Sequence, residues 1–349
     1  MSKYTLDTVK AKLIRISKWA GGILGIILAI VIIFRVGSFL KNVFFPPPEP
    51  LPQVSFGVLP KIFFPDSVKK DFTYTIDTLT GELPDFPSQV KVYKIVLDEP
   101  DILAVQRADE KVKSLGFNIG PQQLSDTVYR WKSDDALVKD LVISVKLPEF
   151  NLSSSFLTNA NVLSGKDVPT EAEAISIAQG FIEALSLYPE DIDDEKVVTK
   201  LLTISSGVVV PATSFSNAKL VNVYFFQKVK DKLPVIYPQG DLSTMSVTVG
   251  SGEREPEVVD ARFFYQKISD DGATYPIKTA KEAFEELKSN KAFITSHQGT
   301  DLNILIKEVY LGYYIEGRQQ DFLTPVIVFE GNNNFFAYVP AVKDEWVDK

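Results

Sequence analysis

The sequence predicts an α+β protein, in which an N-terminal transmembrane helix is followed by extracytoplasmic, repeated helix-plus-antiparallel-sheet units. Three observations predict this class. An apolar segment flanked by basic residues lies near the N-terminus, a run of prolines follows it, and helix patterns are then scattered among alternating strand patterns. The expected parts are a cytoplasmic basic tail (1–18), a transmembrane helix (19–40), a proline-rich spacer (41–53) and two α+β domains (54–165 and 166–349).

The apolar segment is long enough to cross a lipid bilayer. It reads WAGGILGIILAIVIIF over residues 19–34 and continues past one arginine to residue 40. These 22 positions cover a hydrocarbon core of about 30 Å at about 1.5 Å per residue. Long basic side chains and aromatic rings at its ends are typical of membrane interfaces. The predicted anchor and interface residues are Trp19, Arg35, Lys41, Phe44 and Phe45.

Two interpretations of this N-terminus compete. A cleaved signal peptide also has a basic end and an apolar core, but no small-x-small cleavage pattern follows the core here, which favours an uncleaved signal-anchor. Five basic residues precede the segment, so the positive-inside rule predicts a single-pass cell-membrane protein with residues 1–18 in the cytoplasm and 46–349 outside. The tail itself is either an amphipathic helix on the inner leaflet or simply a topology signal.

The charge is divided along the chain. Residues 1–45 hold seven basic residues and one acidic residue, a net of +6, so the formal total of −8 leaves −14 on residues 46–349. A body this acidic repels phosphate, so we expect no nucleic-acid partner. The chain has no cysteine, which excludes disulfides and thiolate sites and favours a bacterial or archaeal source.

A stiff spacer and extended arms precede the regular elements. The sequence PPPEPLP at residues 46–52 spans about 20 Å as polyproline II. Residues 54–65 and 74–89 are rich in proline and aromatics, which predicts extended arms or edge strands packed on the body.

The first α+β unit is predicted from one helix and three strands. Strand patterns at 90–97, 127–131 and 140–147 accompany a helix over about residues 101–115, whose apolar residues fall on one face and which ends at Gly116. The order is strand, helix, strand, strand.

The second unit has two helices that begin with capping boxes, at Thr170 with Glu173 and at Thr279 with Glu282. A hairpin turn is expected at Asp271-Gly272. The predicted strands cover 219–229, 242–250, 260–268, 302–317, 323–331 and 334–342.

The Thr-x-x-Glu-Ala helix start at Thr170, the tyrosine-bearing strands after it and the closing TPVIVFEGNNNFFAYVPAV resemble PepSY-type domains and Yyc-type membrane-anchored accessory regulators of bacterial sensor kinases. The resemblance covers the organisation of about residues 90–342 and short patches of sequence. It implies a single N-terminal span, repeated extracytoplasmic helix-plus-sheet units, and binding or regulation without catalysis. It assigns no residue a role, and the arm at 46–65 is not part of the family pattern.

Few residues suggest chemistry. His297 is the only histidine, so neither a histidine cluster for zinc nor a convincing triad with Ser296 is predicted. The acidic run at residues 190–195 has no glycine, so it is either a solvated turn or a weak calcium site. We expect no cofactor and no enzyme activity; a hydrolase that uses carboxylates alone is the least favoured alternative.

Aromatic residues are concentrated near the C-terminus. Half of them are expected in the sheet core, and the other half face a second layer, a ligand or a partner. The candidate partner-binding aromatics are Tyr310, Tyr313, Tyr314, Phe335, Phe336 and Tyr338. The sequence therefore predicts a non-catalytic interaction or regulatory module for an envelope protein, with a peptide- or glycan-binding module as the alternative.

Overall fold

The computed structural model describes residue 19 and residues 28–37, 50–97 and 102–348, in two units, Met1–Leu51 and Pro52–Lys349. In the first unit residues 28–37 are helical, with exposed apolar side chains. Within the described residues, no helix combines the length and the apolar character that a membrane crossing requires. Residues 1–18, 20–27 and 38–49, and with them Lys41, Phe44 and Phe45, lie outside the described residues.

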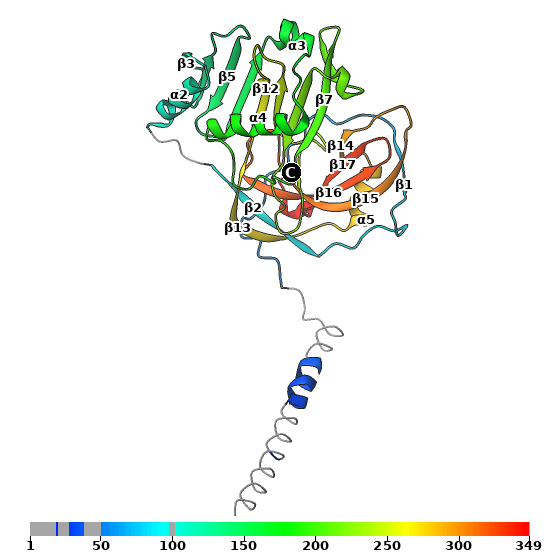
Figure 1. The fold of residues 1–349 in the computed structure, drawn as a ribbon. Coiled ribbons are helices and arrows are strands. Elements are labelled where there is room, and N and C mark those ends of the chain that lie inside the picture. Colours follow the sequence, from blue (N-terminus) through cyan, green and yellow to red (C-terminus); the bar gives the residue numbers. More distant parts are fainter. Residues whose placement is uncertain (1–18, 20–27, 38–49, 98–101, 349) are drawn as a thin grey trace, which may run out of the picture. The chain divides into compact units, whose positions relative to one another are not determined.

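The second unit contains a nine-stranded antiparallel sheet. One helix, α4 (Glu171–Ala184), lies across a face of this sheet (Figure 1) and packs on its central strands. A second helix, α2 (Ala104–Ser114), adds Val112 to the same core. In spatial order the strands are β3 (Ile119–Gln123), β4 (Val128–Lys132), β5 (Lys139–Ser144), β6 (Glu149–Ser154), β12 (Glu257–Phe264), β11 (Met245–Gly250), β9 (Leu220–Phe225), β7 (Val198–Ser205) and β8 (Val208–Pro211).

The other sheet has eight strands and carries the C-terminal part of the chain. Its main path is β1 (Thr73–Ile76), β15 (Asn303–Tyr314), β16 (Phe322–Gly331), β17 (Phe335–Pro340) and β14 (Phe293–Ser296). β2 (Gln89–Val96) pairs with β16 and with β13 (Lys267–Pro276), and β10 (Val235–Ile236) pairs with β15. Helix α5 (Ala280–Lys288) packs on β17, and short helical turns are α3 (Ala160–Ser164), η1 (Phe156–Thr158), η2 (Phe215–Asn217) and η3 (Asp344–Trp346).

Both predicted capping boxes are present. Thr170 accepts a hydrogen bond from the Glu173 backbone at the start of α4, and the Glu173 carboxylate accepts one from the Thr170 backbone. Thr279 and Glu282 do the same at α5. These reciprocal bonds satisfy amide groups that the first turn leaves without partners, so the helices begin where the local sequence predicts.

Strands from the two sides of the predicted domain boundary, between residues 165 and 166, pair with each other. β6, from the expected first domain, pairs with β12, and β2 pairs with β13 and β16. Residues 52–349 therefore form one unit. The physical reason is that an open sheet edge pairs with whichever strand the fold brings beside it, and such long-range pairing leaves no local pattern in the sequence.

The expected hairpin turn at Asp271-Gly272 is wrong. Both residues lie inside β13, where the register with β2 shifts between Ile268 and Gly272. The extra residues of β13 form a β-bulge. A glycine inside a strand often marks such a bulge.

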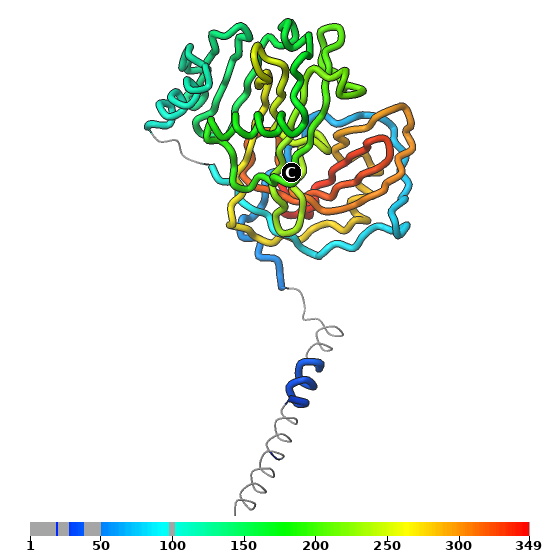
Figure 2. The backbone as a smooth tube through the Cα atoms, viewed as in Figure 1, coloured from blue at the N-terminus to red at the C-terminus, as the bar shows by residue number. Residues whose placement is uncertain are grey.

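The extended arm is confirmed for residues 54–65 and 74–89. Side chains alternate between half-buried and exposed along much of it, as they do in a strand. Its inward residues join three separate core clusters of the body, and Figure 2 shows the arm, blue to cyan, running along the eight-stranded sheet. Among these inward residues are Val54, Phe56, Ile62, Phe64, Tyr74 and Ile76.

Candidate functional site

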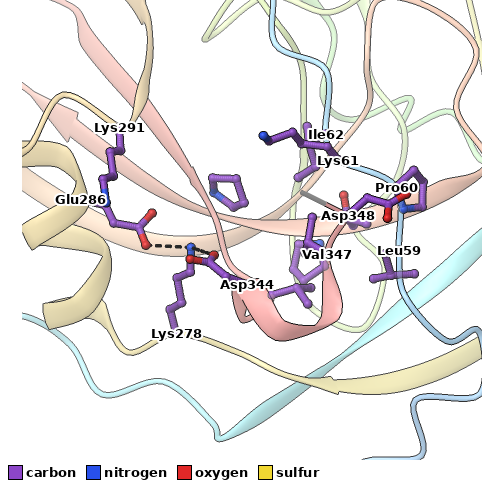
Figure 3. A pocket seen from close by; sticks show the side chains of 14 residues that line it. Leu59, Pro60, Lys61, Ile62, Lys278, Glu286, Lys291, Asp344, Val347 and Asp348 are labelled. Carbon is purple, nitrogen blue, oxygen red and sulfur yellow. Dashed lines mark ion pairs between the residues drawn. The ribbon is translucent and has the colours of Figure 1, made fainter.

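A cavity of about 530 Å³ lies where the arm, the eight-stranded sheet, α5 and the C-terminal segment meet (Figure 3). This volume is in the range of small-ligand sites, which is about 300–1,000 Å³. The arm contributes residues 59–62, and strands β16 and β17 contribute their ends near Pro325 and Pro340. The whole lining is Leu59, Pro60, Lys61, Ile62, Lys278, Glu286, Lys291, Thr324, Pro325, Pro340, Val342, Asp344, Val347 and Asp348.

A buried lysine lies at this cavity. The Lys278 side chain is only 8% exposed, and its Nζ lies 2.8 Å from a carboxylate oxygen of Glu286 and 2.8 Å from one of Asp344. Figure 3 shows Lys278 extending toward both acids. A buried ammonium is tolerated only when it is paired in this way.

The fold fixes Lys278 from both sides along the chain. Its backbone N–H donates to the Ala341 carbonyl, and the next residue, Thr279, is the N-cap of α5. The same helix carries Glu286 about two turns beyond its N-cap, so one acid of the pair is held by the helix. The segment directly after β17 and helix α5 therefore place the lysine together.

The second acid comes from a different kind of element. Asp344 is on the short turn η3, and its side chain is 84% exposed. Leu59 of the arm keeps the segment in place: its N–H donates to the Trp346 carbonyl, and its carbonyl accepts from the Asp348 N–H, both at 2.9 Å. The Trp346 ring also contacts Tyr275 edge-on. The arm and the C-terminal segment thus close one side of the cavity together.

The rim carries two further cations. Lys61 and Lys291 are exposed, and within the described part of the chain neither takes part in an ion pair. The remaining walls are mostly proline and aliphatic side chains. The cavity thus combines apolar walls with the paired ammonium group of Lys278, the two rim lysines and one further carboxylate, that of Asp348.

The predicted partner-binding aromatics lie mainly in the core. Tyr313, Tyr314, Phe335 and Tyr338 have no exposed surface. Strong burial raises the pKa of Tyr313 and Tyr314 above the ordinary phenol value, so both stay neutral. These four residues therefore do not reach the surface of the described structure, because the arm and the strands around them cover both faces of the sheet.

The two other predicted aromatics, Tyr310 and Phe336, are half-buried at one end of this sheet. Tyr310 Oη donates a short hydrogen bond to Glu330. Burial raises the pKa of Glu330, and Glu308, its direct partner across the strands, raises it further. Tyr310 and Phe336 are the members of the predicted set that retain some exposure.

The remaining sequence candidates are not brought together. His297 contacts the Phe72 ring and lies 3.2 Å from Lys70 Nζ, whereas Ser296 Oγ donates to the Asn334 carbonyl. In the acidic turn, Asp191 accepts from Gln227, and Asp194 accepts from Tyr188. The residues that the structure describes contain no group of three acidic or histidine side chains placed to hold a metal ion.

Sequence reasoning missed the cavity and its lysine. Lys278 stands in a plain IKTAKEAFEEL context, and nothing there marks it as buried. The available signal was its place directly before a capping box, which fixes its backbone, but its partner Asp344 is too distant in sequence to be inferred.

Comparisons with known proteins give fold likeness at a low level. No family model matches the chain, and no curated protein matches it. Among solved structures, an uncharacterized protein from Eubacterium rectale aligns with 73% of this chain and 85% of its own, at 11% identity and a TM-score of 0.40. The C-terminal domain of Bacillus megaterium YpeB aligns with 70% of this chain and 94% of its own, at 12% identity and a TM-score of 0.34. Likeness at this level assigns the chain to no family.

Proposed function

We propose that this protein is a non-catalytic interaction module, held at the cell membrane by its N-terminal segment, whose extracytoplasmic body binds a protein of the cell envelope. The observation that carries the binding role is the cavity of about 530 Å³ beside Lys278. The sequence resembles PepSY-type and Yyc-type regulators. On the basis of this resemblance, the proposal includes a sensor kinase as the envelope partner.

The chemistry of the cavity supports binding over catalysis. Its buried polar groups are committed to one another, since Lys278 is held between Glu286 and Asp344. Asp344 is largely exposed, so the two acids are not the pair of buried, facing carboxylates that a hydrolase needs. The apolar walls favour capture of a hydrophobic side chain or segment.

The location outside the cytoplasm rests on the sequence. The apolar positions from Trp19 to Leu40 follow five basic residues, and a proline spacer separates them from the body. A spacer in polyproline II would keep the body at a set height, which suits contact with a neighbouring envelope protein.

A photocrosslinking residue placed in the cavity rim tests the proposal. The full chain carrying the crosslinker in place of Lys61 is expected to give a specific adduct with one membrane or envelope protein in its native membrane. The same crosslinker in place of Lys132, an exposed lysine of β4 in the other sheet, is the control. Identical adducts from both positions, or none from position 61, would refute binding at the cavity.

A free peptide is the second candidate ligand, because the cavity volume of about 530 Å³ and the rim lysines Lys61 and Lys291 fit a short segment with an acidic group. If position 61 crosslinks to short peptides and to no envelope protein, this second function replaces the first.

A further inference from the structure

We infer that Lys278 is the anion anchor of the cavity, that the ligand is an apolar carboxylate, and that Asp344 occupies the place of the ligand's carboxylate until it binds. This inference rests on the proposed binding role of the cavity and specifies the chemistry of what enters it. Binding is an exchange of carboxylates on one ammonium, with no covalent bond made or broken.

The two acids on Lys278 differ in how firmly they are held. Glu286 lies on α5 with its side chain 22% exposed, and it alone neutralises the lysine. Asp344 is a second negative charge on the same ammonium, 84% exposed and carried by the C-terminal turn. An exposed carboxylate loses little when it returns to water, so Asp344 is the partner that a ligand displaces.

The surroundings select the rest of the ligand. Aliphatic and proline side chains line the space next to Lys278, including Leu59, Ile62 and Val342. They favour an apolar chain attached to the carboxylate. A carboxylate without an apolar chain would only replace the carboxylate of Asp344 on Lys278. It would bury no apolar surface and so would gain little free energy of binding.

The rim lysines offset negative charge at this cavity. Residues 46–349 carry a formal net charge of −14, yet Lys61 and Lys291 at this cavity have no ion-pair partner among the described residues. Lys61, Lys278 and Lys291 balance the lining acids Glu286, Asp344 and Asp348, so the cavity has no net charge and repels a carboxylate less than the acidic body around it does.

A matched pair of probes tests the inference on the full chain in lipid nanodiscs. The first probe is a fluorescein-labelled Leu-Val-Val peptide with a free C-terminal carboxylate, and the second is the same peptide with a carboxamide. Fluorescence anisotropy is expected to show binding of the free carboxylate about tenfold tighter or more, because a charge-assisted bond to Lys278 is lost in the amide.

Two substitutions connect that preference to the named residues. Asp344→Asn is expected to tighten binding of the free carboxylate at least about threefold, since the competing anion is removed. Lys278→Met is expected to abolish the preference for carboxylate over carboxamide. The matched controls are Asp270→Asn, an exposed acid paired with Lys230, and Lys139→Met, a mostly buried lysine paired with Glu257; both should bind as the unaltered chain does.

The source of the carboxylate is decided by competition. Octanoate that displaces the peptide, where octanol does not, indicates a fatty acid as an acceptable ligand; failure of octanoate restricts the site to peptide C-termini. Either result keeps the anchor role of Lys278.

Equal binding of the two peptides, or no effect of Asp344→Asn, would overturn the inference. The Asp344→Asn result decides the matter if Lys278→Met does not fold, because position 344 is exposed and tolerates the change. A crosslinked partner at position 61 together with no carboxylate preference would leave the proposed function standing and refute only this inference.

Discussion

Gly272 and Tyr93 face each other across β13 and β2 so closely that a Cβ on the glycine would lie 2.7 Å from Tyr93 Cε1. The tyrosine cannot retreat. Its side chain is almost fully buried, its ring contacts Tyr313 at 5.8 Å between centroids, and its hydroxyl donates to Asp231.

Gly272→Ala is therefore expected to destabilise the body by about 1–3 kcal/mol through overpacking at the β13 bulge. Urea unfolding followed by circular dichroism measures the change. The control is Gly180→Ala on the exposed side of α4, where a Cβ would meet no atom within 4 Å and the backbone φ is not positive. That control has neither a clash nor a backbone cost, so an equal loss at both positions would contradict the steric explanation.

Glu330 is expected to make stability depend on pH. Burial raises the pKa of Glu330 in the folded state above the ordinary 4.5. The contribution of the protonated carboxyl group to the free energy of unfolding is therefore fully present below about pH 4.5, and it is lost as the pH rises through the folded pKa. Glu330→Gln keeps an acceptor for Tyr310 and cannot ionise. Its free energy of unfolding, relative to the unaltered chain, should increase between about pH 4 and about pH 7.

Thermal unfolding at a series of pH values checks this prediction for Glu330. Glu253→Gln, in an exposed loop, should show no such trend. A gain that is the same at every pH would mean that ionisation of Glu330 is not its cause.

Gln266 joins its own loop to the loop between β15 and β16 through a buried hydrogen-bond network. Its side-chain amide donates to the Arg318 carbonyl at 3.2 Å and to Gln320 Oε1 at 2.9 Å, and its oxygen accepts from the Gln320 N–H. Gln266→Leu removes these partners of the Arg318 carbonyl and the Gln320 N–H, although Gln320 Oε1 keeps the Glu316 N–H, and should cost about 3 kcal/mol. Chemical denaturation measures the loss, with Gln122→Leu on the exposed strand β3 as a control expected to change stability little.

Phe64 attaches the arm to the body. Its ring stacks on Phe293 at 4.9 Å and contacts Tyr314 at 5.0 Å between centroids. Phe64→Ala should destabilise the arm by about 2–4 kcal/mol and speed protease cleavage within residues 54–70. The neighbouring Phe63, which points outward beneath Arg318, supplies the matched control. Equal cleavage of both variants would show that the arm is held by other contacts.

Local signals in the sequence predicted local structure well. The capping boxes at Thr170 and Thr279 mark the starts of α4 and α5, because the side chains that satisfy the first turn are near in sequence. Strand alternation located β5, β9 and β15 to β17 for the same reason. These elements require only neighbours along the chain.

The arrangement of the strands could not be predicted from the sequence, because it depends on contacts between residues that are far apart along the chain. Nothing near Phe150 indicates that it pairs with Phe263, and the Asp271-Gly272 pair is typical of a turn until Tyr93 is placed beside it. The candidate site has the same origin: Lys278 and Asp344 are unremarkable separately, and only the folded chain brings them within 2.8 Å.

The bridge between Leu59 and Val347 places the beginning and the end of the body next to each other. A short peptide could then join residue 348 to residue 53, and the chain could be opened instead at the exposed turn Ser206-Gly207. Such a circular permutant would keep every strand neighbour, but its chain would begin with β8 of the nine-stranded sheet and no longer with β1 of the eight-stranded sheet. We therefore expect the final arrangement of this body to be independent of where its gene begins.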